Sequence, residues 1–337
     1  MKPTPCRFLR WQPPPTIEIV QPLDHVTVKS PGGRMRHRDI WGANGGSDLV
    51  DFPGCFAWYE LLTTDVSGAG TFYGSVFGWQ VQDASTPNLP YALFTAAKAP
   101  ICGLMDLPEE GRSAGVKPTW MAYVAVNDID VTSERIKRLG GTVYVPPTNT
   151  NIGRISVVAD PQMATFALVS ALRVGREQPA ESGRPGHVGW HELLAEDWAK
   201  SFAFYSDCFG WERTRSEIGQ GDIYHPFSAC GLTIGGIFTR HPSDPPPFWL
   251  LYFNVEDIDA AAERVKAAGG EVFLNPQELP GGISIARCAD PQGAAFAMQG
   301  KQGHTAKLGW STEWSGFSSK GRLITPRPRP RPPESES

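Results

Sequence analysis

Two glutamates, Glu60 and Glu192, occupy the same place in a short motif, W-x-E-L-L, that occurs twice in the chain. Side chains two residues apart on a strand share a face, so each glutamate lies beside a tryptophan, Trp58 or Trp190. A carboxylate enclosed by aromatic side chains loses hydration, which raises its pKa and suits it to act as a general acid or base. The alternative role is structural, because a glutamate that accepts hydrogen bonds from backbone N–H groups or an arginine anchors the fold.

The residues around these glutamates suggest a site for an organic ligand. The candidate ligand-binding residues are two tryptophans, two tyrosines and two glycines: Trp58, Trp190, Tyr91, Tyr224, Gly103 and Gly236. Indole rings offer flat surfaces for stacking an aromatic or cationic ligand, and the phenols add hydroxyl groups. A glycine on a strand lets a ligand or a second backbone approach closely. The alternative is that the aromatic rings fill the core and the glycines mark bulges.

Composition excludes several other functions. Lys and Arg number 31 against 35 Asp and Glu, for a net charge of −4. The chain therefore lacks the excess of positive charge that attracts nucleic-acid phosphates. The sequence also lacks the GxxxxGK[ST] phosphate-binding loop and the HExxH zinc motif. No apolar run approaches the roughly 20 residues that span a bilayer, and the N-terminus lacks a signal-peptide core. We therefore predict a cytoplasmic protein whose partner is a small molecule, not a nucleic acid or a membrane.

The cysteines support the same prediction of compartment. The six are Cys6, Cys55, Cys102, Cys208, Cys230 and Cys288. They are widely dispersed and form no C-x-x-C pair, unlike the dense frameworks of small secreted domains. We therefore expect reduced thiols.

The W-x-E motifs belong to a longer internal repeat. WYELLTTD and WHELLAED are followed by FYGSVFGWQ and FYSDCFGWE, then by VNDID and VEDID, and then by ADPQ in both copies. The first two pairs share an offset of 132 residues, from 58 to 190. This ordered series places one domain at 52–170 and a second at 186–300, joined by a Gly/Pro/Glu/Arg-rich linker at 171–185. Residues 1–51 and the Pro/Arg-rich tail at 301–337 have the composition of disordered extensions.

Each copy shows the pattern strand, helix and several strands, twice over. In the first copy, residues 56–63 have the aromatic and aliphatic content of a strand, and Asp65 can cap a helix after it. Asp128 can cap the second helix, which Gly140 and Gly141 end. We therefore predict an α+β protein of four βαβββ modules.

This series of motifs resembles the glyoxalase/bleomycin-resistance/extradiol-dioxygenase group, the vicinal oxygen chelate superfamily, over residues 52–300. The resemblance implies two glyoxalase-like domains, each with curled mixed sheets that form half-barrels around a ligand. It also implies that Trp58, Glu60 and their equivalents face this concave side, and that Tyr59 and His191, one residue out of phase, point toward the helices. Enzymes of the group hold a divalent metal on the concave side.

The family's metal-ligand positions can be mapped onto both copies. By the resemblance they fall on Trp58, Met121, Ala167, Trp190, Leu250 and Ala297. None of these side chains is a good ligand for Mg, Mn, Fe or Zn. The sequence therefore predicts no metal site of the family type and no other cofactor.

Three functions remain. The leading hypothesis is a small-molecule-binding protein that sequesters an aromatic or amphipathic metabolite or antibiotic. The second is an enzyme of the same fold, either hydroxylase- or dioxygenase-like or a lyase or isomerase, that uses Glu60 or Glu192 as acid or base. The third is an interaction scaffold that binds a partner through the Pro/Arg tail. Because a tandem chain can pair its modules internally, we expect a monomer and not a homodimer.

Overall fold

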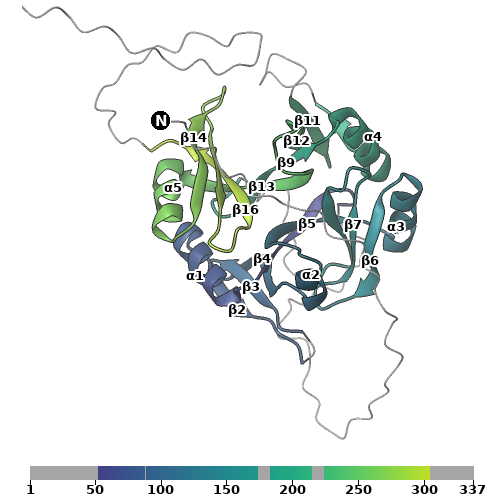
Figure 1. Cartoon of the computed structure of the whole chain (residues 1–337), viewed down its shortest axis with the longest axis horizontal. Coiled ribbons are helices and arrows are strands. Elements are labelled where there is room, and N and C mark those ends of the chain that lie inside the picture. The colour runs from purple at the N-terminus through teal and green to yellow at the C-terminus, as the bar shows by residue number, and fades with distance from the viewer. Residues whose placement is uncertain (1–51, 88, 174–182, 215–223, 304–337) are drawn as a thin grey trace, which may run out of the picture. The chain divides into compact units, whose positions relative to one another are not determined.

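The computed structural model describes residues 52–87, 89–173, 183–214 and 224–303. Within them the chain forms two eight-stranded sheets and five helices (Figure 1). The predicted extension at 1–51 and most of the predicted linker and tail lie outside the described residues. None of the helices in the described ranges is long and apolar enough to cross a membrane.

The first copy folds into one sheet with the strand order β2-β3-β4-β1-β5-β8-β7-β6. Its strands are β1 (Phe56–Thr63), β2 (Gln80–Asp83), β3 (Ala92–Ala96), β4 (Ala99–Asp106), β5 (Thr119–Ala125), β6 (Thr142–Asn149), β7 (Arg154–Ala159) and β8 (Thr165–Ser170). β1 and β5 are antiparallel at the centre, whereas β1 with β4 and β5 with β8 are parallel. Parallel neighbours need a crossover, and α1 (Val66–Phe77) and α3 (Ile129–Arg138) lie in these connections. A short helix, α2 (Glu109–Ser113), joins the two βαβββ modules.

The second copy repeats this topology in the order β10-β11-β12-β9-β13-β16-β15-β14. Its strands are β9 (Val188–Ala195), β10 (Glu212–Arg213), β11 (Tyr224–Ala229), β12 (Leu232–Thr239), β13 (Phe248–Asp257), β14 (Glu271–Glu278), β15 (Ser284–Ala289) and β16 (Ala295–Lys301). Helices α4 (Trp198–Phe209) and α5 (Ile258–Ala267) take the places of α1 and α3. The predicted α+β class with four βαβββ modules is confirmed.

Local sequence explains where the four longer helices begin and where two of them end. The N-cap residues are Asp65, Asp128, Asp197 and Asp257. Each carboxylate accepts a hydrogen bond from a backbone N–H group of the first turn, which otherwise lacks a partner. α1 and α4 end at Gly78 and Gly210, with φ of 75° and 72°, a left-handed conformation that favours glycine.

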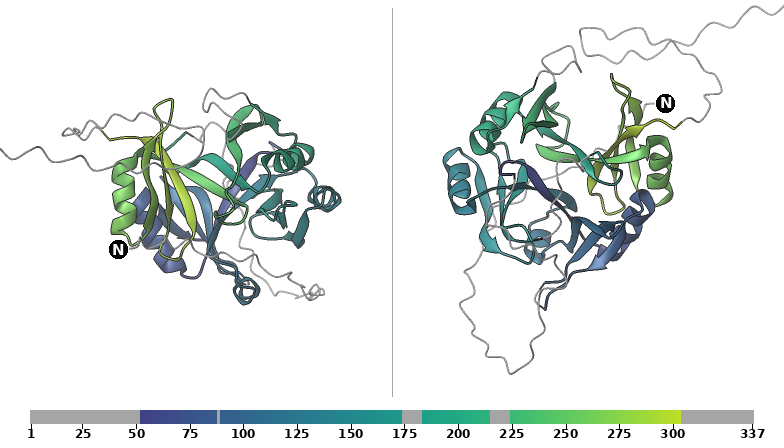
Figure 2. Two further views of the ribbon diagram at one scale, coloured as in Figure 1. Left: turned by 45° about the horizontal axis from the view of Figure 1, so that its top comes forward. Right: turned by 180° about the vertical axis from the view of Figure 1, so that it is seen from behind.

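Strand alternation divides the buried side chains between two faces of each sheet. Tyr59 and Leu61 of β1 belong to the core that includes the helices, whereas Trp58 belongs to a cluster on the opposite face. We call this opposite side the inner face. The helix-side core is continuous across both copies, while each inner face has a cluster of its own. Helices of different copies also meet, since α1 contacts α5 and α3 contacts α4 (Figure 1, Figure 2).

Tyr59 and His191 point toward the helix side, as alternation predicts, and they bind each other. The two residues occupy the same position in the two copies, and Tyr59 Oη lies 2.7 Å from His191 Nε2. Contact between equivalent positions places them on the approximate twofold axis that relates the copies. His191 Nδ1 lies 2.8 Å from the Ile234 carbonyl oxygen, and Phe56 stacks on the imidazole at 4.0 Å.

Two contacts away from this axis form a reciprocal pair. The Tyr73 hydroxyl of α1 donates to Asp290 in the second copy at 3.1 Å, and the Tyr205 hydroxyl of α4 donates to Asp160 in the first copy at 3.2 Å. Each aspartate is the first residue of a D-P-Q turn and also accepts backbone N–H groups of its own turn. The repeated F-Y and D-P-Q motifs therefore hold the two copies together.

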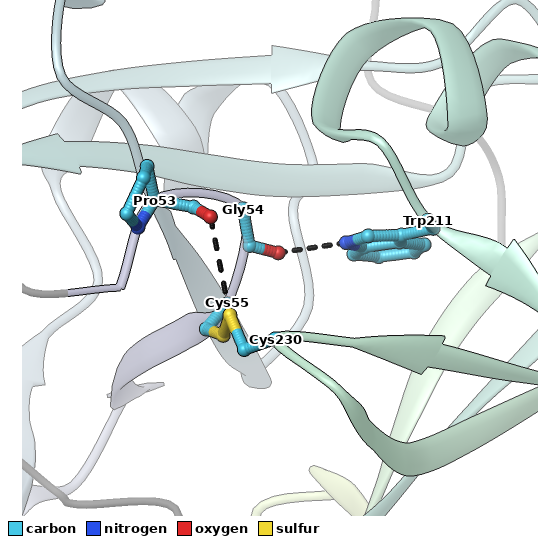
Figure 3. Close-up of a disulfide and its surroundings, with 5 residues drawn as sticks. All are labelled: Pro53, Gly54, Cys55, Trp211 and Cys230. Carbon is cyan, nitrogen blue, oxygen red and sulfur yellow. Dashed lines mark hydrogen bonds between the residues drawn. A yellow bond between two sulfur atoms is a disulfide. The ribbon is translucent and has the colours of Figure 1, made fainter.

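The prediction that all six cysteines are reduced is wrong for two of them. Cys55, just before β1, forms a disulfide with Cys230 in the second copy, and their Cα atoms are 6.1 Å apart (Figure 3). This separation lies within the usual range for bonded cysteines. The spacing of the cysteines in the sequence does not predict this pair, because 175 residues separate the two and only the docking of the copies brings them together. Among the described residues, Cys102, Cys208 and Cys288 take no part in a disulfide.

Candidate functional site

The predicted site residues of the first copy meet on the inner face of its sheet. Trp58 Nε1 donates to the Tyr91 hydroxyl at 3.3 Å, and the Tyr123 hydroxyl donates to Glu60 Oε2 at 2.6 Å. Tyr91 also donates to Glu60. Gly103 lies directly beneath this group, because a Cβ atom on it would overlap the Tyr91 hydroxyl. The four polar side chains thus form one connected network.

This first network is closed to solvent. Trp58 is fully buried, and Glu60, Tyr91 and Tyr123 are each exposed by less than 5%. Burial raises the pKa of Glu60, while the hydrogen bonds from Tyr123 and Tyr91 act in the opposite direction. Both tyrosines donate to the carboxylate. Glu60 therefore matches the anchoring role better than proton exchange with a ligand.

The inner face of the second copy has the same residue types with one addition. Trp190 Nε1 donates to the Tyr224 hydroxyl at 2.7 Å, and the Tyr252 hydroxyl donates to Glu192 Oε2 at 2.5 Å. Arg287 also donates to Glu192 Oε2, through Nη2 at 2.7 Å, and to the Tyr252 oxygen through Nε at 3.3 Å. Val157 occupies the position of Arg287 in the first copy, and no charged side chain among the described residues forms an ion pair with Glu60.

The second inner face is also more exposed. Trp190 and Tyr224 are partly exposed, and 26% of the Arg287 side chain is accessible against 7% of Glu192. Burial and the charge of Glu192 raise the pKa of Tyr224, so its phenol keeps its proton. This hydroxyl accepts the indole N–H of Trp190, and no described residue accepts its own proton in a side-chain hydrogen bond. A hydrogen-bond donor is therefore available to a ligand.

Two residues account for the closure of the first inner face. Ile152, in the turn before β7, and Leu172, after β8, are buried in the same cluster as Trp58. The positions 130 residues later, the spacing of the two ADPQ sequences, are Gly282 and Gln302. Gly282 is exposed and Gln302 partly exposed. The second copy thus lacks the apolar side chains that cover the first.

A second exchange makes the second inner face more polar. Ala125 and Val169 pair across β5 and β8 and are fully buried. Their equivalents across β13 and β16 are Asn254 and Gln299, whose side-chain amides are hydrogen-bonded at 2.8 Å and partly exposed. Only the second inner face therefore combines aromatic, amide and charged groups with access to solvent.

The positions that correspond to metal ligands do come together, but their chemistry does not fit a metal. Trp58, Met121 and Ala167 lie in the first inner cluster, and Leu250 and Ala297 lie in the second with Trp190 packed against them. The oxygen donors of each inner network are one carboxylate and two phenols. Within the described residues there is no group of three His, Cys, Asp or Glu side chains that could hold a metal ion. We therefore derive no metal-dependent step.

One nucleophile motif occurs elsewhere in the chain. Residues 111–115, GRSAG, have the form G-x-S-x-G. A nucleophile elbow places its serine between a strand and a helix, whereas Ser113 ends the exposed helix α2 and donates to Glu109 at 3.3 Å. The geometry does not match a hydrolase site.

Sequence analysis missed three residues that complete the two networks: Tyr123, Tyr252 and Arg287. Their signal was the two-residue period of the strands, since Tyr123 follows Met121, Tyr252 follows Leu250 and Arg287 follows Ile285 on the inner face. Alignment of the copies would also have shown the arginine opposite a valine.

Comparisons with known proteins agree with this architecture. The family model Glyoxalase/Bleomycin resistance protein/Dioxygenase superfamily matches residues 56–168 and again 184–298. CFP32 of Mycobacterium tuberculosis, provisionally named a glyoxylase, is 33% identical over 245 residues, which cover 72% of this chain and 92% of that protein. The anthracycline biosynthesis protein DnrV of Streptomyces peucetius is 36% identical over 150 residues, covering 37% of this chain and 54% of DnrV.

Solved structures with the same fold are more distant in sequence. The Mn(II)-bound glyoxalase from Novosphingobium aromaticivorans superposes with a TM-score of 0.54 at 17% identity, covering 75% of this chain and 83% of that one. The 2,3-dioxygenase LapB from Pseudomonas superposes with a TM-score of 0.52 at 12% identity, covering 77% and 96%. The chain therefore belongs to the glyoxalase/bleomycin resistance protein/dioxygenase superfamily, with two copies of its domain.

Proposed function

We propose that the protein binds a small organic molecule on the inner face of its second domain and needs no metal to do so. The observation that carries the proposal is the difference between the copies. Trp190, Tyr224 and Arg287 of the second inner face are accessible, whereas their equivalents in the first are buried or replaced by valine. The first inner face then serves as a structural core.

The side chains define the chemistry of the ligand. The indole of Trp190 and the ring of Phe238, which lies beneath the Arg287 guanidinium at 5.8 Å, favour a flat aromatic or amphipathic body. The Tyr224 hydroxyl favours an oxygen acceptor on that body, such as a carbonyl or a phenol. Glu192 already balances the charge of Arg287, which favours a neutral ligand over a strong anion. Because DnrV is named for anthracycline biosynthesis, anthracyclines belong in any ligand panel.

A thermal-shift screen of aromatic metabolites and antibiotics tests this proposal. A ligand present at 100 times its Kd stabilises the protein by about 2.7 kcal/mol, which corresponds to a rise in Tm of roughly 5–10 °C. We expect this shift to fall by more than half in Tyr224→Phe and to persist in Tyr91→Phe, the matched control of the first domain. An equal loss in both variants, or none in either, would contradict the assignment of the site. Stoichiometric Fe, Mn, Ni or Zn in the purified protein would refute the metal-free proposal.

The second candidate function is catalysis, and the surroundings of Glu192 favour that residue over Glu60. Glu192 lies beside the accessible Arg287 and can exchange a proton with a ligand on the inner face, whereas tyrosines enclose Glu60. If a hit from the screen is converted, Glu192→Gln should abolish turnover and Glu60→Gln should preserve it. Turnover unchanged in Glu192→Gln would eliminate this role.

We also propose that the protein is monomeric. The helix sides, through which single-domain chains could dimerise, are already covered by contacts between the two copies. Light scattering of the eluting protein should give the mass of one 36.8 kDa chain, and a mass twice as large would contradict this expectation.

A further inference from the structure

The disulfide connects the first domain to the hairpin that carries part of the candidate site. Cys230 lies in the turn between β11 and β12, where Cys230 and Gly231 have φ of 54° and 77°. Two consecutive left-handed residues form the turn that matches strand twist in tight hairpins. Cys55 precedes β1 of the first domain (Figure 3). The bond therefore fastens the tip of the hairpin to the other copy.

The twofold symmetry of the chain does not reproduce this bond. The matching hairpin of the first domain, between β3 and β4, turns at Ala97 and Lys98 with φ of 47° and 72°. Ala97 takes the place of Cys230, and His187, 132 residues after Cys55, takes the place of the other cysteine. Among the described residues, only the hairpin of the domain with the accessible inner face is therefore linked covalently to the other copy.

Docking of the two copies does not depend on the bond. The reciprocal contacts of Tyr73 with Asp290 and of Tyr205 with Asp160, together with the shared helix-side core, remain when the sulfurs separate. Trp211 also donates to the Gly54 carbonyl oxygen at 2.7 Å, one residue from Cys55. The reduced chain should therefore stay folded, with the change limited to the hairpin.

The same hairpin reaches the inner face at its other end. Tyr224 begins β11 and pairs with Phe238 of β12, and Gly236 makes room for the Tyr224 ring. Five residues of one short strand separate Tyr224 from Cys230. A hairpin held at its tip by a covalent bond has fewer conformations than one held only by packing, so the bond limits the movement of Tyr224.

We propose that the Cys55–Cys230 disulfide is a reversible redox switch that controls the order of the β11–β12 hairpin, and hence of the Tyr224 side of the second inner face. The role of Tyr224 in ligand binding rests on the proposed function; the switch in the hairpin does not. Oxidised protein holds the hairpin in place, and reduced protein releases it.

The exchange chemistry follows from the exposure of the two sulfurs. Cys230 is exposed and Cys55 is 7% exposed, so an incoming thiolate of a dithiol attacks Cys230 Sγ. The S–S bond breaks, Cys55 leaves as a thiolate and takes up a proton, and a mixed disulfide forms at Cys230. The second thiol of the reagent then displaces Cys230 and closes the reagent's own disulfide. The protein gains two thiols while one dithiol is oxidised.

Hydrogen exchange read by mass spectrometry tests the switch on the full-length chain, with the β3–β4 hairpin as internal control. Non-reducing peptide mapping of air-oxidised protein should give a linked Cys55–Cys230 peptide. After dithiothreitol, amides of β11 and β12 should exchange at least tenfold faster while amides of β3 and β4 stay unchanged. Cys230→Ala should exchange like the reduced protein and show no response to dithiothreitol.

Three results would overturn the proposal. They are the absence of the linked peptide, exchange of β11 and β12 that dithiothreitol leaves unchanged, and equal acceleration of both hairpins, which would indicate a global staple. None of these measurements uses a ligand, so failure here leaves the proposed function standing. Conversely, a screen that hits no site near Tyr224 leaves the exchange result intact.

Discussion

Protonation of His191 should destabilise the protein in mild acid. The carbonyl of Ile234 can only accept, so Nδ1 carries the proton of the neutral ring and Nε2 accepts the hydroxyl of Tyr59. Burial, partly opposed by the Ile234 carbonyl, lowers the pKa of His191 from 6.5 to about 4. Between these values the unfolded chain binds more protons than the folded one, so stability falls as pH drops from about 6.5 to about 4. At 1.36 kcal/mol per pKa unit, the loss is about 3 kcal/mol.

His191→Gln isolates this effect, because an amide can keep both hydrogen bonds but does not titrate. The wild-type profile alone is not diagnostic, since Asp160 changes stability in the opposite direction over part of the same range. Urea unfolding of both proteins should be measured from pH 7.5 to pH 4. We expect the variant to be the less stable protein at pH 7.5 and the difference to shift in its favour by about 3 kcal/mol at pH 4. A difference that does not change with pH would refute the argument, as would an imidazole resonance of His191 that titrates near 6.5.

Three further predictions concern the interface and the first inner face. Gly103→Ala should lower the free energy of unfolding by about 1–3 kcal/mol, because the added methyl overlaps the buried Tyr91 hydroxyl. Burial raises the pKa of Asp160 from 3.8 to about 6, so the folded chain binds more protons than the unfolded chain between these values, and stability falls as pH rises through them. Asp160→Asn should remove this fall, about 3 kcal/mol in the free energy of unfolding, from the urea-derived pH profile. Trp211→Phe should cost at least about 1 kcal/mol more than Trp79→Phe in the same assay, because only the Trp211 indole N–H has a described partner.

The sequence predicted the fold well, because each signal for it is local and occurs twice. The aspartate caps at Asp65 and Asp128 and the strand at 56–63 lie where the patterns predict them. Alternation also predicted that Trp58 and Glu60 share a face and that His191 points away from it. Long-range partners were not predictable in this way. Nothing near Cys55 in the sequence indicates Cys230, because their contact depends on how two whole domains dock.

In the candidate site, the repeated residues conceal a difference between the two copies. The copies agree at Trp, Glu, Tyr and Gly, so a search for repeated residues treats the two inner faces as equivalent. Their difference arises at Val157 against Arg287 and at the apolar cover residue Ile152 against Gly282. The effect of both exchanges depends on burial. Arg287 gives a buried carboxylate a charged partner, and the glycine in place of Ile152 leaves an indole accessible to solvent.

The two copies are alike on the helix sides of their sheets and differ on the inner faces. On the helix side, a tyrosine of each copy binds an aspartate of the other, as Tyr73 binds Asp290. Both copies must therefore keep the same residues, because a substitution in one copy leaves its partner in the other without a hydrogen bond. Among the described residues the two inner faces form separate clusters, so no contact between the copies constrains them in this way. One copy can therefore fill its inner face and stabilise the fold while the other keeps an accessible one. The Cys55–Cys230 bond agrees with this difference between the faces. It lies at the interface of the copies and has no symmetric counterpart, and it joins the hairpin of the domain whose inner face is accessible.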